Sequence, residues 1–272
     1  MLPRFGLAPL GFLEIAPPDF IALAAAAGFA SVNLRTRAAV PGGQECPLRV
    51  GSEGVRACRR RIADTGITVR QIEQVGLDRG TDVSALRPML EAGAELGVAS
   101  VLCSGDDPDL ALVADRFGAL CQLAREFGMA VELEFMPFRA LKTLTDAIAV
   151  LIASAADNGR VCVDALHLFR SGGKVAGLRA VDPGRLGSLQ LADAPLTPPP
   201  PHRLAEEARE RRCLPGQGEL PLEELLAAWP ADHPIDAEIP MLRAVPDPGA
   251  LARARLIAAA MRDLLGRRRA PA

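Results

Sequence analysis

The sequence predicts an α/β protein folded as a single (β/α)8 barrel of parallel strands. Short apolar runs alternate with longer helical patterns along the chain, giving eight strand positions. The length of 272 residues suits a closed barrel, which commonly needs about 250 residues as one domain. An open doubly wound sheet is the alternative, but it usually needs fewer strands, and the sequence has no Gly-rich phosphate-binding turn. We therefore expect one domain over residues 1–272.

The predicted strands are apolar or alternating runs bounded by turn residues. They cover residues 5–15, 30–34, 67–75, 98–103, 129–135, 160–163, 186–191 and 235–239. Residues 30–34 alternate between small or polar and apolar side chains, as a strand with one buried face does. A strand followed by a helix, repeated along the chain, implies parallel strands with helical crossovers.

The predicted helices lie between these strands and several of them end at a glycine. They cover residues 20–27, 52–64, 82–96, 109–127, 143–156, 221–229 and 247–265. The first helix follows Pro18 and Asp19, a common helix opening. Glycine is a frequent C-terminal stop because it adopts the left-handed conformation without strain. The glycines concerned are Gly28, Gly66, Gly97 and Gly128.

Two stretches rich in proline and glycine interrupt this alternation, at residues 39–51 and 194–220. Both follow a predicted strand, so both are expected at the carboxyl end of the barrel, where such enzymes build their active sites. A disordered insertion is the alternative for residues 39–51. The arginine-containing tail at residues 266–272 is expected to be a solvated end.

Composition excludes several classes of function. The net charge is −2, so no basic surplus is present to neutralise a phosphate backbone, and aromatic residues make up only 4% of the chain. No apolar run approaches the roughly 20 residues that span a bilayer, and the N-terminus lacks signal-peptide organisation. The six cysteines form no C-x-x-C pair, which favours reduced thiols. We expect a cytoplasmic protein without nucleic-acid or membrane partners.

Oxygen-bearing side chains stand at the ends of four consecutive predicted strands. The residues are Glu134, Asp164, Gln190 with Asp193 close behind it, and Glu238. A buried carboxylate is costly unless it is paired or bound to a metal, and this oxygen-rich set suits Mg, Mn or Co. The alternative is that each acid caps the following helix or pairs with an arginine.

Four further residues are candidates for contact with a substrate. His167 follows Asp164 by three residues, a spacing that turns both side chains to one face of a first helical turn. Arg212 lies in the long loop after the seventh strand, where it either clamps a substrate oxygen or is a surface charge. Glu73, late in the third strand, and Arg35, after the second, are weaker candidates.

An ordered set of motifs resembles the xylose isomerase-like TIM-barrel superfamily, the sugar phosphate isomerase/epimerase group. The motifs are VELEFMPF at 131–138, VCVDALH at 161–167, LQLADA at 189–194, LPGQG at 214–218 and AEIP at 237–240. The opening, with PPD at 17–19 and AAGF at 26–29, is also similar to the first unit of that group. The similarity spans nearly the whole chain in the right order, but it does not specify the substrate.

The resemblance implies one divalent metal ion, with Mn, Mg, Co and Zn all considered, held by Glu134, Asp164, Gln190 and Glu238. Many members of the superfamily have histidine where this chain has Gln190. Some sugar-acid dehydratases of the superfamily look similar in having glutamine there. Endonuclease IV relatives use a histidine-rich trinuclear zinc site, which a chain with three histidines cannot supply.

Three hypotheses for function follow. The first is a metal-dependent isomerase or epimerase of a sugar, sugar phosphate or inosose, with Glu134 and Glu238 as acid and base and with His167 and Arg212 orienting oxygens. Asp193 is added to the expected substrate contacts. The second is a dehydratase of a cyclic polyol ketone or a dehydroshikimate-like acid, in which His167 assists loss of a hydroxyl. The third is a non-catalytic sugar-binding barrel.

The expected partner of the chain is accordingly a small polyhydroxylated carbonyl compound, within carbohydrate metabolism. A homodimer or a homotetramer is compatible with the sequence.

Overall fold

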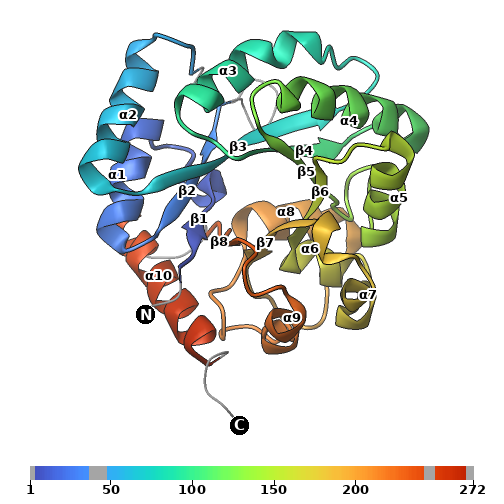
Figure 1. Cartoon of the computed structure of the whole chain (residues 1–272). Coiled ribbons are helices and arrows are strands. Elements are labelled where there is room, and N and C mark those ends of the chain that lie inside the picture. Colours follow the sequence, from blue (N-terminus) through green and yellow to red (C-terminus); the bar gives the residue numbers. More distant parts are fainter. Residues whose placement is uncertain (1–3, 37–47, 242–248, 268–272) are drawn as a thin grey trace.

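Eight parallel strands close into a barrel, as the sequence predicts, in a computed structural model that describes residues 4–36, 48–241 and 249–267 (Figure 1). The strands are β1 (Gly6–Leu7), β2 (Ser31–Arg35), β3 (Thr68–Leu77), β4 (Ser100–Gly105), β5 (Ala130–Glu134), β6 (Gly159–Asp164), β7 (Leu186–Leu191) and β8 (Ile235–Ala237). Each strand pairs in parallel with the next, and β1 pairs with β8 to close the ring.

Helices follow the strands and surround the barrel (Figure 1). The α-helices are α1 (Pro17–Ala27), α2 (Glu53–Thr65), α3 (Arg87–Glu95), α4 (Leu110–Arg125), α5 (Leu144–Ser154), α6 (Ala165–Arg170), α7 (Val175–Arg179), α8 (Leu204–Glu210), α9 (Leu222–Ala228) and α10 (Ala250–Arg267). Short 3₁₀ turns are η1 (Pro9–Phe12), η2 (Ser84–Leu86), η3 (Pro183–Arg185) and η4 (Pro201–Arg203). Within the described ranges, no helix has the length and apolar character needed to cross a membrane.

Local signals in the sequence explain where these helices begin and end. Thr143 and Asp146 form a reciprocal capping box at the start of α5, which satisfies two backbone N–H groups that the helix leaves unpaired. The Ser52 hydroxyl accepts a bond from the backbone N–H of Val55 at the start of α2. Gly28 ends α1 with φ 91°, a conformation that favours glycine.

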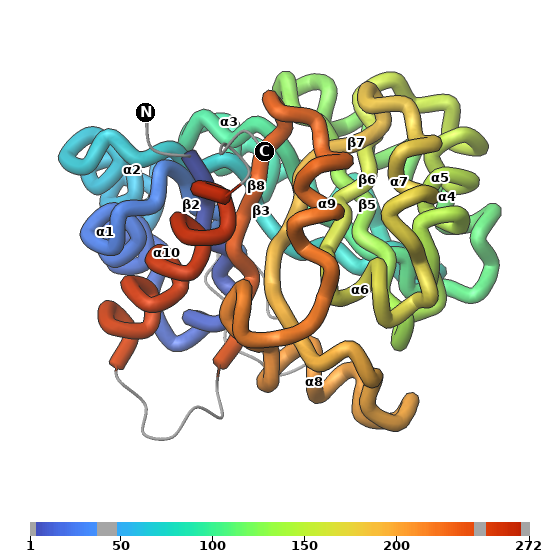
Figure 2. Tube along the Cα trace, turned by 90° about the horizontal axis from the view of Figure 1, so that it is seen from below, coloured from blue at the N-terminus to red at the C-terminus, as the bar shows by residue number. Residues whose placement is uncertain are grey.

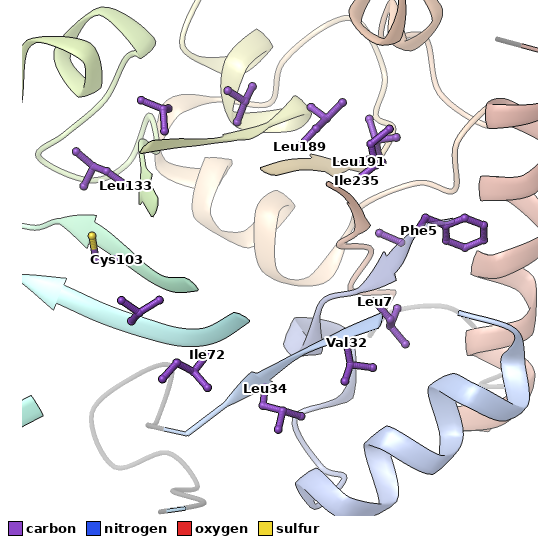
Figure 3. Packing of buried hydrophobic residues seen from close by; sticks show 14 of the residues in the cluster. Phe5, Leu7, Val32, Leu34, Ile72, Cys103, Leu133, Leu189, Leu191 and Ile235 are labelled. Carbon is purple, nitrogen blue, oxygen red and sulfur yellow. The ribbon is translucent and has the colours of Figure 1, made fainter. Parts of the chain in front are cut away.

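Apolar side chains of the strands point outward and pack under the helices (Figure 3). Buried polar side chains alternate with them along the strands, and this alternation places them on the inner face of the barrel. In β2 the buried Val32 and Leu34 flank Asn33, which is fully buried. In β7 the apolar residues Leu189 and Leu191 likewise flank the polar residue Gln190, and all three are buried. The barrel therefore has an apolar outer core and a polar interior, and that interior positions the site.

A charged layer crosses the interior below the carboxyl ends of the strands. Arg70 on β3 donates to Glu132 on β5 at 3.0 Å and forms an ion pair with Asp236 on β8. Ser100 and Ser188 donate hydrogen bonds to the two carboxylate oxygens of Glu132. Each of these groups pairs with another buried polar group, and the layer joins five strands across the barrel.

Three parts of the predicted secondary structure are wrong in detail. Only Gly6 and Leu7 of the run at 5–15 form a strand, because the prolines that follow support the turn η1. The predicted helix at 82–96 divides into η2 and α3, with Pro88 in the first turn of α3. The sequence pattern also missed α6, α7 and α8, which are only five to seven residues long and too short to show a helical period.

Two predicted segments fall partly or wholly outside the described residues. Residues 37–47 cover most of the predicted loop at 39–51, and residues 268–272 cover most of the predicted tail. The long loop at 194–220 is described and carries α8, which lies beyond one end of the barrel (Figure 2). The five described cysteines are free thiols, in agreement with the prediction of reduced cysteine.

Candidate active site and metal centre

A pocket at the carboxyl ends of the strands brings together residues from both halves of the chain. Its lining residues are Leu10, Arg35, Glu73, Gln74, Glu134, Met136, Phe138, Arg139, His167, Ala208, Arg209, Arg212 and Glu238. Glu134 and Glu238 were both predicted as site residues, and so were four other lining residues: Arg35, Glu73, His167 and Arg212. The predicted residue Asp164 contacts two of these, His167 and Arg212. The strand-end positions read from the sequence therefore do converge.

Three buried carboxylates lie at the inner end of this pocket: Glu134 and Glu238 line it, and Asp164 contacts two of its lining residues. Glu134 is the last residue of β5, Asp164 is the last residue of β6, and Glu238 follows β8 directly. All three are at most 4% exposed. Burial, reinforced by the neighbouring Glu238 and Asp164, raises the pKa of Glu134 well above its usual value. Burial also raises the pKa of Glu238 to about 8.

Arg212 lies between two of these acids. Its guanidinium forms an ion pair with Asp164 and a second one with Glu238, at 3.0 Å. Its Nε donates to the backbone carbonyl of Ala208 in α8 at 2.7 Å, which fixes the plane of the group. Burial alone would raise the pKa of Asp164, but Arg212 more than offsets this effect and the pKa is lowered. The structure thus excludes a surface position for Arg212, which is 4% exposed.

His167 belongs to α6, the short helix that begins as soon as β6 ends. The Asp164 carboxylate accepts a bond from the backbone N–H of His167 at 3.0 Å and so caps this helix. The imidazole Nε2 lies 3.8 Å from a carboxylate oxygen of Glu134, and the ring meets Phe138 edge-on at 5.4 Å. Burial lowers the pKa of His167 to about 4, so the ring is neutral at pH 7.

Gln190, near the end of β7, has a side-chain amide with no hydrogen-bond partner among the described residues. Both its Oε1 and its Nε2 are buried, and its register partners on the adjacent strands β6 and β8 are Asp164 and Asp236. An unpaired buried amide is rare in folded proteins and points to a missing ligand. Donor atoms of Glu134, Asp164 and His167 lie within 4.8 Å of one another, close enough to hold one cation. This cluster shares Glu134 and Asp164 with the predicted ligand set and adds His167, whereas Gln190 and Glu238 remain predicted ligands whose oxygen donors suit a divalent metal.

Residues on β2 and β3 complete one wall of the pocket. Arg35 donates to Glu73 at 3.3 Å, and burial raises the pKa of Glu73 while Arg35 partly offsets that effect. Gln74 donates through Nε2 to a carboxylate oxygen of Glu134 at 3.1 Å. Sequence alternation could not have selected Gln74, because adjacent residues of a regular strand face opposite sides. The register of β3 against β4 shifts between Ile72 and Val75, and both Glu73 and Gln74 line the pocket.

The structure corrects the predicted role of Asp193 as a substrate contact. One carboxylate oxygen of Asp193 accepts bonds from the backbone N–H groups of Ala194 and Leu220, and the other accepts from Gly216 and Gly218, all at 2.9–3.1 Å. Asp193 is absent from the pocket lining. Its carboxylate instead holds the ends of the long loop together, because four backbone donors already satisfy it.

The sequence analysis also missed three residues at the outer part of the pocket: Phe138, Arg139 and Arg209. Phe138 and Arg139 lie in the turn after β5, and Arg209 lies in α8. Phe138 is the last residue of the motif at residues 131–138, so the motif could have pointed to it. Arg139 and Arg209 reach the pocket through loops whose paths no local pattern encodes.

Comparison with known proteins identifies relatives of the whole fold. A family model for the xylose isomerase-like TIM barrel matches residues 21–254. A solved fusion protein of a xylose isomerase-like TIM barrel and a 4-hydroxyphenylpyruvate dioxygenase is 21% identical, with a TM-score of 0.81. The match covers 99% of this chain but 44% of that one, so this chain spans less than half of the fusion protein.

Two further solved structures match over almost their full lengths. The IOLI protein with a bound zinc atom has a TM-score of 0.81 and 16% identity, over 99% of this chain and 100% of that one. The probable 3-DHS dehydratase AsbF from Bacillus anthracis has a TM-score of 0.73 and 13% identity, over 95% of this chain and 98% of that one. No curated protein matches the sequence. At these identities the structural likeness establishes the fold alone.

Proposed function

Because the chain belongs to the xylose isomerase-like TIM-barrel family, we propose that it is a divalent-metal-dependent isomerase or epimerase of a small polyhydroxylated carbonyl compound. The compound is a sugar, a sugar phosphate or an inosose. The observation that supports this most is the pair Glu134 and Glu238, two buried carboxylates with raised pKa that line the same pocket. The buried, unpaired amide of Gln190 on β7 adds to it.

Glu134, Asp164, Gln190 and Glu238 would hold the metal. When bound, such a cation supplies positive charge that stabilises the negative charge developing on the substrate oxygens. The IOLI structure, which has a bound zinc atom, supports a cation site in this type of barrel. Arg212 already places one positive charge between Asp164 and Glu238, so the carboxylates do not face one another uncompensated.

The proton transfers fall to the two glutamates. One of Glu134 and Glu238 removes the proton from the carbon next to the carbonyl group, and the other returns a proton. Raised pKa values suit this work, because a carboxyl group that holds its proton more tightly can accept one from the substrate and return it. Gln74 orients Glu134 through its hydrogen bond, and the neutral imidazole of His167 contacts a substrate oxygen.

Exchange of solvent deuterium tests this function. We expect the Mn-loaded protein in deuterium oxide to place deuterium on the carbon next to the carbonyl of at least one substrate in a panel of ketoses and inososes. Glu134→Gln and Glu238→Gln should each slow this exchange by about 10²–10⁴-fold. Metal content measured on the same samples separates loss of a proton carrier from loss of the metal.

Glu126→Gln, at an exposed ion pair with Arg87, is the matched control and should exchange normally. A metal-loaded protein that exchanges no deuterium with any member of the panel would contradict the proposal.

One observation favours a second candidate, a dehydratase of a cyclic polyol ketone or a dehydroshikimate-like acid. Gln190 stands at a position where many members of the superfamily have histidine. Some dehydratases of the superfamily look similar to this chain in having glutamine there. The same proton abstraction would then be followed by loss of a β-hydroxyl as water: the carboxyl group that took up the proton returns it to the leaving oxygen, and the N–H of the neutral His167 ring assists by a hydrogen bond. Elimination produces a conjugated enone, so a rise in ultraviolet absorbance distinguishes it from isomerisation. A flat absorbance trace with every cyclic substrate removes this candidate.

A further inference from the structure

Three arginines surround the outer part of the pocket, above the buried carboxylates. Arg35, Arg139 and Arg209 line the same pocket as Glu134 and Glu238. The side chains of Arg35 and Arg139 are 10% and 30% exposed, whereas the side chains of the acids below are at most 5% exposed. Solvent therefore enters on the arginine side, and a substrate must pass these groups.

Arg209 differs from the other two arginines in its contacts. Arg35 pairs with Glu73 at 3.3 Å, and Arg139 pairs with Asp106 at 3.4 Å. Arg209 makes no hydrogen bond or ion pair with any residue in the described ranges, and its guanidinium lies 5.6 Å above the ring of Phe138. Phe138 in turn contacts His167, so Arg209 stands one aromatic ring away from the predicted acid–base group.

The charges around Arg209 favour an anion beside it. Burial, together with the neighbouring Arg139 and Arg35, lowers the pKa of Arg209, and the acids that partly offset this effect are Asp106 and Glu210. Like charges gathered in a pocket are unfavourable until an anion lies among them. Arg139 and Arg35 also each have a buried Nε without a hydrogen-bond partner in the described part of the chain.

The charge balance of the whole pocket leads to the same conclusion. The pocket lining and the carboxylate paired with it contain four acids and four arginines. The acids are Glu73, Glu134 and Glu238 in the lining and Asp164 paired with Arg212; the arginines are Arg35, Arg139, Arg209 and Arg212. A divalent cation adds two positive charges, and Asp106 offsets one of them. A metal-loaded pocket thus has a positive surplus that an anionic substrate would neutralise.

The size of the pocket determines where the anionic group would lie. The pocket is open to solvent and has a cavity volume of about 50 Å³, far below the roughly 300 Å³ at which ordinary ligand pockets begin. A substrate of five or more carbons with its reacting carbons at Glu134 must therefore extend outward, towards Phe138 and Arg209.

We propose that Arg209, together with Arg139, binds an anionic group at the end of the substrate remote from the reacting carbons. This inference rests on the proposed function and deepens it: the substrate carries a carboxylate or a phosphate in addition to its hydroxyls. A guanidinium with no protein acceptor is preorganised for either group, because its planar donors match two anionic oxygens at once.

Binding of three matched polyols to the Mn-loaded protein tests the inference by calorimetry. The probes are sorbitol, gluconate and sorbitol 6-phosphate, which share a six-carbon chain and differ in one terminal group. We expect gluconate or sorbitol 6-phosphate to bind at least about tenfold more tightly than sorbitol. The stronger of the two identifies the anion as a carboxylate or a phosphate.

Arg209→Gln should remove most of that preference, by about tenfold or more, and should leave sorbitol binding unchanged. Arg203→Gln is the matched control, because Arg203 lies beside the same helix, is exposed and pairs with Glu206. Its affinities should equal those of the parent protein. Equal binding of the three probes, or an unchanged anion affinity in Arg209→Gln, overturns the inference.

The deuterium-exchange experiment keeps this outcome separate from the proposed function. If a neutral ketose or inosose exchanges deuterium while no anion is preferred, the function stands and the anion subsite is refuted. If metal loads but no substrate of either kind exchanges deuterium, the proposed function itself fails.

Discussion

Asp164 shows how one side chain can organise a site on two sides at once. One of its oxygens caps α6 by accepting from the backbone N–H of His167, and the other pairs with Arg212, 48 residues away. The position of His167 and the burial of Arg212 both depend on this carboxylate. A fully buried acid is tolerated here because each oxygen has a donor, and a metal would add a further positive charge.

Two substitutions separate the predicted metal ligand from the predicted substrate contact. Asp164→Asn should lower metal affinity by at least about tenfold and reduce activity with it, since even outer-shell changes cost about 10–100-fold. Asparagine still caps a helix, so α6 should persist. His167→Ala should lower turnover by about 10²–10⁴-fold with normal metal content, as expected for a lost acid–base group. Normal metal content and full activity in both variants would show that the site lies elsewhere.

At the scale of elements, the loop at 194–220 depends on a single aspartate rather than on apolar packing alone. Four backbone N–H groups converge on Asp193, and Cys213 pairs with it as an isolated bridge. A Cβ atom added at Gly218 would lie 2.4 Å from an Asp193 oxygen, so the close approach requires glycine. Arg209 and Arg212 belong to this loop and line the pocket, so Asp193 affects the positions of these two arginines although it does not line the pocket itself.

Asp193→Ala should loosen the loop and lower the free energy of unfolding by about 3 kcal/mol, because several charge-assisted hydrogen bonds are lost. Limited trypsin digestion should then cleave within α8, at sites that are protected in the parent protein. Asp182→Ala is the control, since Asp182 accepts one backbone bond in an exposed turn. Equal protease resistance in the two variants would refute the anchoring role.

The whole molecule is held together from inside the barrel as well as from outside. Arg70, Glu132 and Asp236 join β3, β5 and β8 across an interior that most proteins of this size fill with apolar side chains. Gly6 on β1 leaves room for this layer, because a Cβ atom there would lie 2.1 Å from an Asp236 oxygen. Closure of the barrel between β1 and β8 therefore depends on the same charged residues that lie below the site.

Arg70→Met should destabilise the barrel by about 3–5 kcal/mol, because it leaves two buried carboxylates without their cation. Urea denaturation followed by circular dichroism measures the change. The matched control is Arg60→Met, at an exposed pair with Glu53, and it should unfold at the same urea concentration as the parent protein. If both variants unfold together, the interior layer contributes nothing to stability.

Local patterns in the sequence are enough to predict the order of the strands and the polar residues at their carboxyl ends. Apolar and polar residues alternate along the strands, so Glu134, Asp164, Gln190 and Glu238 were predicted at the strand ends from local pattern. Glycines such as Gly28 marked helix ends, because the left-handed conformation is a local property of the backbone. These features depend on neighbours a few residues apart, which is why the sequence carries them.

The tertiary structure alone decided which distant side chains meet. Arg212 is buried between Asp164 and Glu238 only because the barrel closes and α8 folds over its end. The same closure turned Asp193 from an expected substrate contact into a loop anchor and brought Arg209 to the pocket. Contacts of this kind join residues tens of positions apart, and their geometry is set by barrel register and by packing, which no local period in the sequence records.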